Sequence, residues 1–463
     1  MTTHSAQPPI DEELDAERGV PSVAGGSSLL LIARALTSAG FFVAVLLLAR
    51  GLDPVKRGSV AFITVTALVI AAISRFGVDD ATTVFAAQQR DRRPALLANM
   101  LALATVGALL FGGAICSILY LLPGIRPAGV GALELVILLV GAVTASLQSG
   151  ALSFLLGCGR IRTQALATPV FPWLYALLIA LVWVIFGLSV TGAVLVWTGS
   201  QIFTAAVCIA LALPVAGFGK PSWRLLLTTA RFGIRIWARG LAVFANARID
   251  QVIMGLIASE ASLGIYAVAV NAGEVALYIP GAVATALFPI IASTAVEERL
   301  DLTLRVARAL SLIGLTTIAI GALVGSPLIP IVFGQRYDAS IVPFLWLLPG
   351  TLGFSAIAVF GTALAASGSP GRSSLGPTAA LIAGITLDLV LIPRYGADGA
   401  AAAATIAFLA GGAVSTVLHW RFAGYRLSKL VPRLSDLALI WGLARRARRK
   451  MPNRGSREET QGG

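Results

Sequence analysis

Charged residues are scarce in this sequence of 463 residues: they make up 12% of it, whereas hydrophobic residues make up 57%. Soluble globular domains carry about 25% charged residues. The shortage excludes an ordinary soluble domain and places the chain among membrane proteins. Glycine, in contrast, is abundant with 48 residues, as transmembrane helices tolerate.

Cysteine and histidine are too few for most metal and disulfide chemistry. The three cysteines lie in or beside apolar segments without a CxxC pair, and there are two histidines. A disulfide framework or zinc site is therefore not expected. The sequence also lacks a Walker loop, an HExxH motif and a serine nucleophile elbow. We expect no catalytic residue, cofactor or metal, and a chain that is not an enzyme.

Long segments without any charged residue predict membrane-spanning helices, since one helix needs about 20 apolar residues to cross the hydrocarbon core. A transmembrane barrel would instead show short alternating segments. The uncharged segments are 94–125, 135–159, 163–219, 309–335 and 339–371. We predict an all-α polytopic membrane protein with about twelve helices, near 28–50, 58–82, 95–122, 132–157, 164–187, 192–215, 236–258, 262–292, 305–333, 341–367, 374–393 and 398–420.

The basic residues predict the orientation of these helices. With the N-terminus inside, cytoplasmic segments hold 26 Lys and Arg residues and outer segments hold six. Cytoplasmic loops carry the excess of positive charge. We therefore predict a multi-pass protein of a bacterial cytoplasmic membrane with both termini cytoplasmic. The net charge of +13 is mostly explained in this way, and nucleic acid is not an expected partner.

The two ends of the chain are polar and opposite in charge. Segment 1–26 is acidic and lacks the basic start of a signal peptide, so we expect a disordered cytoplasmic tail. Segment 423–463 is basic, and leucines at spacings of three and four predict an interfacial amphipathic helix on anionic membrane lipids.

Two ten-residue segments echo each other. In each, a short polar turn leads to a glycine, Gly58 or Gly264, and three residues later to an alanine. These glycines are 206 residues apart, and Gly192 and Gly399, which open two later helices, are 207 apart. Two similar offsets predict two six-helix bundles around a central cavity, related by an axis along the membrane normal. The expected bundles are 27–215 and 236–422, joined by a basic cytoplasmic linker at 216–235.

Ionisable residues inside membrane spans are costly and usually face a cavity. Arg34 and Arg75 lie in the cytoplasmic halves of the first two spans, where they could form a cationic cup for phosphate oxygens. The alternatives are snorkelling of either arginine to the inner surface and, for Arg75, an ion pair with Asp79 one turn later.

The seventh and eighth spans carry further polar residues near mid-membrane. They predict either a hydrated cavity with an ion-coupling role or structural ion pairs of Arg248 with a carboxylate. Glu134, Asp388 and His419 lie near span ends, where exposure at the interface is expected. The mid-membrane residues are Asn246, Arg248, Asp250, Asn271, Glu274 and Tyr278.

At these positions the chain resembles the polysaccharide exporter (oligosaccharide flippase) family of the multidrug/oligosaccharidyl-lipid/polysaccharide exporter superfamily. The matching segments are 48–54 (LARGLDP), 248–255 (RIDQVIMG), 263–267 (LGIYA) with Phe288-Pro289, and 392–400 (IPRYGADGA), in an order that covers about 27–422. The segment LARGLDP departs from the family's usual Leu-Gly-Pro.

The resemblance implies alternating access by two bundles that flip undecaprenyl-pyrophosphate-linked sugars between leaflets. It implies a cavity lined by the first, second, seventh and eighth spans, with Arg34, Arg75 and Arg248 near the pyrophosphate. A polysaccharide polymerase or glycosyltransferases would be candidate partners.

Three other functions remain open from the sequence. A cation-coupled drug exporter of the same superfamily would use Asp250 and Glu274 as ion sites, although the arginines argue against it. A membrane polymerase or glycosyltransferase would need a large extramembrane loop or an acidic metal motif, and neither is present. A scaffold with vestigial transport, recruiting partners through its basic tail, is the last alternative.

Overall fold

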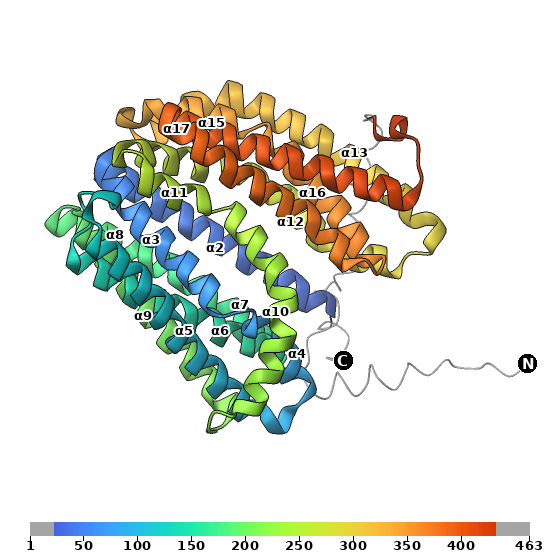
Figure 1. Cartoon of the computed structure of the whole chain (residues 1–463), viewed down its shortest axis with the longest axis horizontal. Helices are drawn as coiled ribbons and strands as arrows, with labels where there is room; N and C mark the ends of the chain where they lie inside the picture. The colour runs from blue at the N-terminus through green and yellow to red at the C-terminus, as the bar shows by residue number, and fades with distance from the viewer. Residues whose placement is uncertain (1–22, 432–463) are drawn as a thin grey trace, which may run out of the picture.

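The computed structural model describes residues 23–431, which form a bundle of α-helices (Figure 1). This described part contains no β-strand, so the predicted all-α polytopic fold is confirmed. Its first half contains α2 (Val23–Gly51), α3 (Pro54–Ser74), α4 (Val78–Gln88), η1 (Arg90–Arg92), α5 (Arg93–Leu121), η2 (Pro123–Ile125), α6 (Ala132–Gly157), α7 (Ile161–Ala167), α8 (Val170–Phe186) and α9 (Val190–Ala216). The second half contains α10 (Trp223–Asn246), α11 (Ile249–Ile257), α12 (Glu260–Ser293), α13 (Val296–Ile320), η3 (Gly321–Gly325), α14 (Ser326–Phe333), η4 (Gln335–Ser340), α15 (Ile341–Leu347), α16 (Gly350–Ala366), α17 (Pro370–Ala423) and η5 (Leu427–Leu430).

Nine helices of the described residues are long and apolar enough to cross a membrane, or eleven if each of two bent pairs counts as one span. The chain is thus a multi-pass membrane protein. The number of twelve spans and the orientation of the termini stay predictions. The parts of the two predicted tails at 1–22 and 432–463, with most of the predicted interfacial helix, lie outside the described residues.

The last long helix, α17, contains a turn. As one straight helix its 54 residues would extend about 80 Å, far beyond the roughly 30 Å of a hydrocarbon core. Gly396 has a non-helical backbone (φ 56°, ψ −125°), which favours glycine and divides the helix. Its two segments pack antiparallel. Their close approach is seen at Gly411, where an added β-carbon would lie 2.7 Å from the carbonyl oxygen of Gly376.

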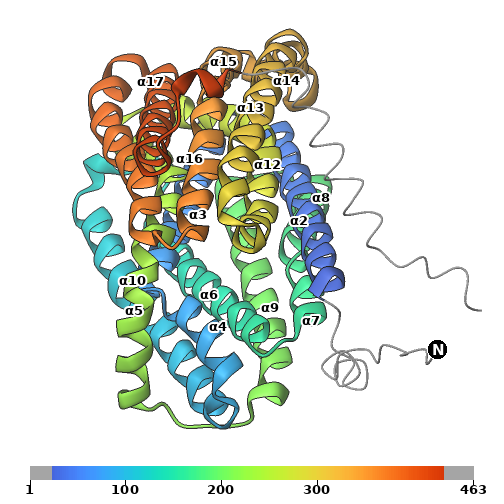
Figure 2. The same ribbon diagram turned by 90° about the vertical axis from the view of Figure 1, so that its right-hand side faces the viewer.

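The helices form two groups that meet along the middle of the molecule. The blue-to-green helices of the first half lie together on one side of the molecule, and the yellow-to-red helices of the second half lie on the opposite side (Figures 1 and 2). The helix α10 contacts α4 and α5 of the first half as well as α17 of the second. Segment 216–235 therefore includes the first half of a helix that bridges both groups.

The end of the bundle at which α2 ends and α3 begins is called the outer end, following the orientation that the basic residues predict. Here α3 and α12 begin in the same way. Asp53 accepts a hydrogen bond from the backbone N–H of Lys56 (2.9 Å), and Ser259 accepts one from that of Ser262 (3.2 Å). Both side chains are N-caps, and they lie 206 residues apart, as the predicted repeat requires.

The two halves are packed tightly against each other at the outer end. A single buried cluster combines Leu48 of α2 and Leu52, which follows α2, with residues of α3, α6, α8 and α9, and extends into α12 and α17 through Leu263 and Ile392. Gly58 of α3 and Gly264 of α12 are in direct backbone contact there. These two glycines, with Ser59 and Glu260 beside them, are called the outer seam. The outer end is therefore closed in this structure.

Candidate functional site

A cavity of about 790 Å³ lies between the halves, below the outer seam. On α2 it is lined from Arg34 to Phe42, whereas Ala44 and Leu48 further along the helix are buried in the core. On α12 it is lined from Tyr266 to Thr285. The cavity thus occupies the middle and inner levels of the bundle and ends before the outer end. No residue of α3 lines it, although the family resemblance implied the second span; the seventh span, formed by α10 and α11, does line it, and α15–α17 contribute as well.

Arg34 is the basic side chain among the lining residues. It is exposed, and it has no hydrogen-bond or ion-pair partner among the described residues. It lies 17 residues before Gly51, the end of α2, which corresponds to about 25 Å along a helix. Arg34 therefore presents an uncommitted guanidinium toward the inner level of the cavity, as phosphate binding requires.

Arg75 does not line the cavity. Its Nε donates to a carboxylate oxygen of Asp79 at 2.9 Å, and both side chains are mostly buried. The pair spans the break between α3 and α4, where Phe76 adopts a left-handed backbone conformation (φ 47°) and packs against Trp237 of α10. The ion pair that the sequence allowed is present, and it ties together a broken helix.

Arg248 is also paired. Its guanidinium contacts the carboxylate of Glu274 and donates to the carbonyl oxygen of Ala247 at 3.0 Å. It is the residue before α11, at a 49° bend between Asn246 and Ile249. Glu274 lines the cavity, whereas Arg248 does not. The structural pair that the sequence left open is therefore present at the cavity wall.

Three other predicted residues line the cavity, and one does not. Asn246 and Tyr278 line it, and the Asn246 amide donates to the carbonyl oxygen of Pro377 at 2.8 Å. Asp250 lines it as well but is largely buried, and its carboxylate accepts a hydrogen bond from the Tyr266 hydroxyl. Asn271 is not among the lining residues; its amide donates to a carbonyl oxygen of its own helix.

The sequence interpretation missed Asp388. We expected Glu134, Asp388 and His419 to be exposed at an interface, and this expectation was wrong: all three are buried. One carboxylate oxygen of Asp388, which is 2% exposed, has no hydrogen-bond partner. Asp388 lies close enough to Asp250 and Tyr266 for electrostatic interaction. A charged residue in an apolar helix was the available signal, but only the fold brings it near Asp250.

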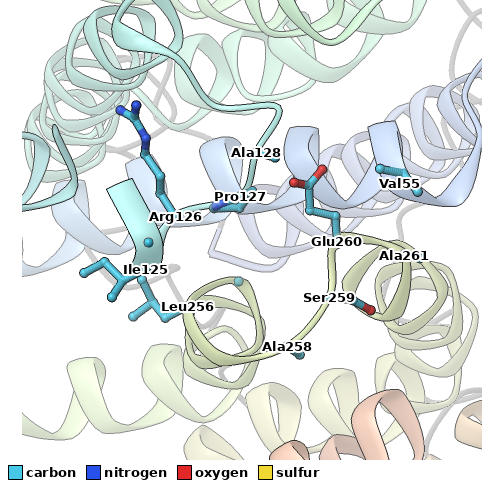
Figure 3. A pocket seen from close by; sticks show the side chains of 12 residues that line it. Val55, Ile125, Arg126, Pro127, Ala128, Leu256, Ala258, Ser259, Glu260 and Ala261 are labelled. Carbon is cyan, nitrogen blue, oxygen red and sulfur yellow. The ribbon is translucent and has the colours of Figure 1, made fainter. Parts of the chain in front are cut away.

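Side chains reinforce the closure of the outer end. The Glu260 carboxylate accepts hydrogen bonds from the Ser59 hydroxyl (2.7 Å) and the backbone N–H of Gly129 (3.2 Å), so a second-half residue joins two first-half elements. Figure 3 shows this carboxyl group pointing toward the segment that carries Pro127 and Ala128. These residues border a pocket of about 390 Å³ on the outer side of the seam.

Two more contacts join the halves at this level. The Nε of Arg50 donates to the carbonyl oxygen of Val332 at 2.7 Å, and the Tyr337 hydroxyl donates to that of Leu52 at 3.1 Å. Within residues 23–431 no cluster of three or more His, Cys, Asp and Glu side chains could hold a metal ion.

The chain matches the model of the family described as polysaccharide biosynthesis protein over residues 47–342, which is more than half of its length. The chain belongs to this family. No curated protein matches it in sequence.

Solved structures with this fold are transporters of the MOP superfamily. The lipid II flippase MurJ in an inward closed conformation has a TM-score of 0.69 at 12% identity, over 90% of this chain and 92% of MurJ. An inward-facing multidrug resistance MATE family transporter has a TM-score of 0.67 at 14% identity, over 85% and 98%. A MOP superfamily transporter from Pyrococcus furiosus has 0.61 at 15% identity, over 91% and 99%. This member of the polysaccharide biosynthesis family thus shares the MATE and MurJ fold.

Proposed function

We propose that the chain flips a prenyl-pyrophosphate-linked oligosaccharide from the cytoplasmic to the outer leaflet of a bacterial cytoplasmic membrane, for cell-surface polysaccharide biosynthesis. The observation that carries the proposal is Arg34, an unpaired guanidinium in a cavity between the halves of a polysaccharide biosynthesis family member. A guanidinium binds phosphate oxygens through two parallel hydrogen bonds.

In this mechanism Arg34 captures the pyrophosphate from the cytoplasmic leaflet. The sugar enters the cavity, where Asn246, Glu274 and Tyr278 offer hydrogen-bonding groups, and the prenyl chain stays in lipid. Arg248 keeps Glu274 paired and ordered. The halves, taken as 27–215 and 236–422, then rock so that the outer seam opens and the inner side closes.

In this proposal Asp250, which lines the cavity, and the buried Asp388 form the site for ion coupling. Asp388 lies near enough to Asp250 for electrostatic interaction and has one carboxylate oxygen without a hydrogen-bond partner, and such a carboxylate in an apolar site binds a proton or cation readily. Exchange of an ion here, linked to Tyr266 and the cavity wall, would drive the rocking of the halves. Under this account Asp250→Asn and Asp388→Asn each abolish the dependence of flipping on a sodium or proton gradient.

The same carboxylates favour one alternative, a cation-coupled drug exporter. The alternative differs in its cargo, because an exporter of cationic drugs has no use for an unpaired arginine in its cavity. Arg34 therefore favours an anionic cargo over a cationic one.

The test is leaflet-resolved flipping by the purified full chain in proteoliposomes. Three fluorescent probes are compared: a short-chain prenyl-pyrophosphate oligosaccharide, the same prenyl pyrophosphate without sugar, and phosphatidylcholine. We expect flipping of the first at a rate well above protein-free vesicles and no acceleration of the third. Gradient-driven efflux of a cationic dye, without flipping of any prenyl lipid, would establish the exporter instead.

A further inference from the structure

Arg57, on the first turn of α3, is a buried cation that the proposed mechanism does not use. Its side chain is 5% exposed, its Nε is fully enclosed, and it has no hydrogen-bond or ion-pair partner among the described residues. Arg75 and Arg248 show the usual arrangement in this chain, since each has a carboxylate partner. Arg57 differs from these two arginines because no carboxylate forms an ion pair with it among the described residues.

The surroundings of Arg57 contain hydroxyl groups but no carboxylate that interacts with it. Tyr337 and Tyr175 lie near enough for electrostatic interaction with Arg57, and neither hydroxyl forms a hydrogen bond with it. The nearby Asp53 is paired with Lys56 instead. A guanidinium among hydroxyl groups, without a competing carboxylate, is the chemistry that recognises a phosphoryl group.

Arg57 lies near side chains of both halves of the chain. Tyr175 belongs to α8 of the first half, whereas Tyr337 belongs to η4 of the second and is held over the end of α2 by its hydrogen bond to Leu52. The next residue in the chain is Gly58 of the outer seam. Separation of the halves at the outer seam would move Tyr337 away from Arg57 and let water or an anion reach the guanidinium.

Burial of Arg57 does not stabilise the closed seam. An ion removed from water without a partner raises the free energy of the state that buries it, and an apolar side chain of similar size would serve packing better. The closed seam thus holds a cation whose hydration, or pairing with an anion, favours opening.

We propose that Arg57 is a second phosphate-binding residue, which pairs with the phosphoryl oxygens of the cargo when the outer seam is open and holds them before release. This inference rests on the proposed function and deepens it. Arg34 lies about 25 Å along α2 from the outer end of that helix, and Arg57 lies on the first turn of the next helix, so the two arginines stand at the inner and outer ends of one route. The anion is exchanged between two arginines, of which the outer one becomes available only after the seam opens.

The test measures opening of the outer seam with inorganic pyrophosphate as the probe. Spin labels are placed on Val55→Cys of α3 and Ala261→Cys of α12, which border the outer pocket. The full chain, with its native cysteines replaced by alanine, is studied in lipid nanodiscs by double electron–electron resonance. An Arg34→Gln background removes the inner arginine from the measurement.

Pyrophosphate is expected to raise the fraction of the longer distance. In Arg57→Gln the half-maximal concentration should rise about 10- to 100-fold, the loss expected for a charge-assisted pair. Lys56→Gln is the matched control, because it removes the same charge from the neighbouring, exposed position and should leave the response unchanged. An Arg57→Gln response equal to that of the parent, or no response of the parent, would overturn the proposal. So would pyrophosphate binding that depends on Arg57 but leaves the distance unchanged.

Thermal unfolding separates this role from a structural one. Arg57→Met should unfold at the same temperature as the parent or higher, because it removes an unpaired buried charge. A decrease in the unfolding temperature of Arg57→Met that is larger than that of Lys56→Met would show that Arg57 stabilises the fold, and would overturn the proposal. Neither the distance measurement nor the unfolding measurement uses a lipid-linked sugar. A negative result in them is therefore distinguishable from failure of the chain to flip the lipid-linked oligosaccharide.

Discussion

Gly58 and Gly264 contact each other reciprocally. A β-carbon on Gly58 would lie 1.9 Å from the carbonyl oxygen of Glu260, and one on Gly264 would lie 1.9 Å from that of Pro54. Each pair of equivalent residues, Gly58 with Gly264 and Pro54 with Glu260, is separated by 206 positions. Equivalent residues of a two-fold repeat can touch each other only beside the axis that relates them. The outer seam therefore lies on the pseudo-two-fold axis of the two halves.

Gly58→Ala and Gly264→Ala should each force the outer seam apart. The added methyl group overlaps a backbone carbonyl, which cannot move aside like a side chain, so we expect a loss of about 1–3 kcal/mol from the closed state. The two variants should behave alike because their surroundings are equivalent. The measurement is the distance between spin labels at positions 55 and 261.

Gly199→Ala is the control for these glycines, because no atom lies within 4 Å of a β-carbon at that position. It should leave the distance distribution unchanged. If both Gly58→Ala and Gly264→Ala kept the short label distance of the closed seam, the contact between Gly58 and Gly264 would not be what closes the outer end.

Arg75→Gln should destabilise the chain without abolishing flipping. The substitution leaves Asp79 without its partner at the break between α3 and α4, and the pair is more buried than a surface ion pair. We expect a loss of about 1–3 kcal/mol, between the values for surface and buried pairs. This loss of stability is measured by thermal unfolding of the single variants and of the exchanged pair, Arg75→Asp with Asp79→Arg. Equal stability of all variants would show that the pair is not structural.

Asp53 should make the outer end sensitive to acid. The backbone N–H of Lys56, together with the Lys56 ammonium, holds the pKa of this carboxyl below its usual value of 3.8. Because the folded pKa is lowered, its contribution to stability is present above pH 3.8 and is lost as the pH falls through the lowered value. Asp53→Asn keeps a capping side chain that does not titrate. The unfolding temperature of Asp53→Asn should fall less than that of the parent between pH 5 and pH 3. Parallel curves of unfolding temperature against pH for the two proteins would refute this prediction.

Much of the fold follows from apolar runs and turn signals. The helices α5, α6 and α9 begin and end within two residues of the predicted spans, because Pro-Gly turns and charged residues mark their ends. The breaks inside other spans were not predicted. The backbone turns at Phe76–Gly77 and Ala247–Arg248 depend on packing against α10 and α12, which the local sequence does not encode.

The candidate site was predictable where polarity in an apolar helix was the signal, as for Arg34, Asn246, Asp250 and Glu274. Arg57 was missed because the second helix was expected to begin at residue 58. The Asp53-Pro54 pair is a helix-start signal, and the helix does begin at Pro54. Burial of Arg57 and the proximity of Asp388 to Asp250 arise from the packing of distant segments, and no local pattern predicts them.

The most direct test of the central claim is flipping of the prenyl-pyrophosphate oligosaccharide by Arg34→Gln and Arg75→Gln, compared at equal amounts of folded protein in proteoliposomes. Arg34 has no partner to lose, so Arg34→Gln should unfold like the parent but flip about 10- to 100-fold more slowly, the loss of one charge-assisted contact. Arg75→Gln should flip at a rate close to that of the parent. Full flipping by Arg34→Gln, or equal losses in both variants, would contradict phosphate capture at Arg34.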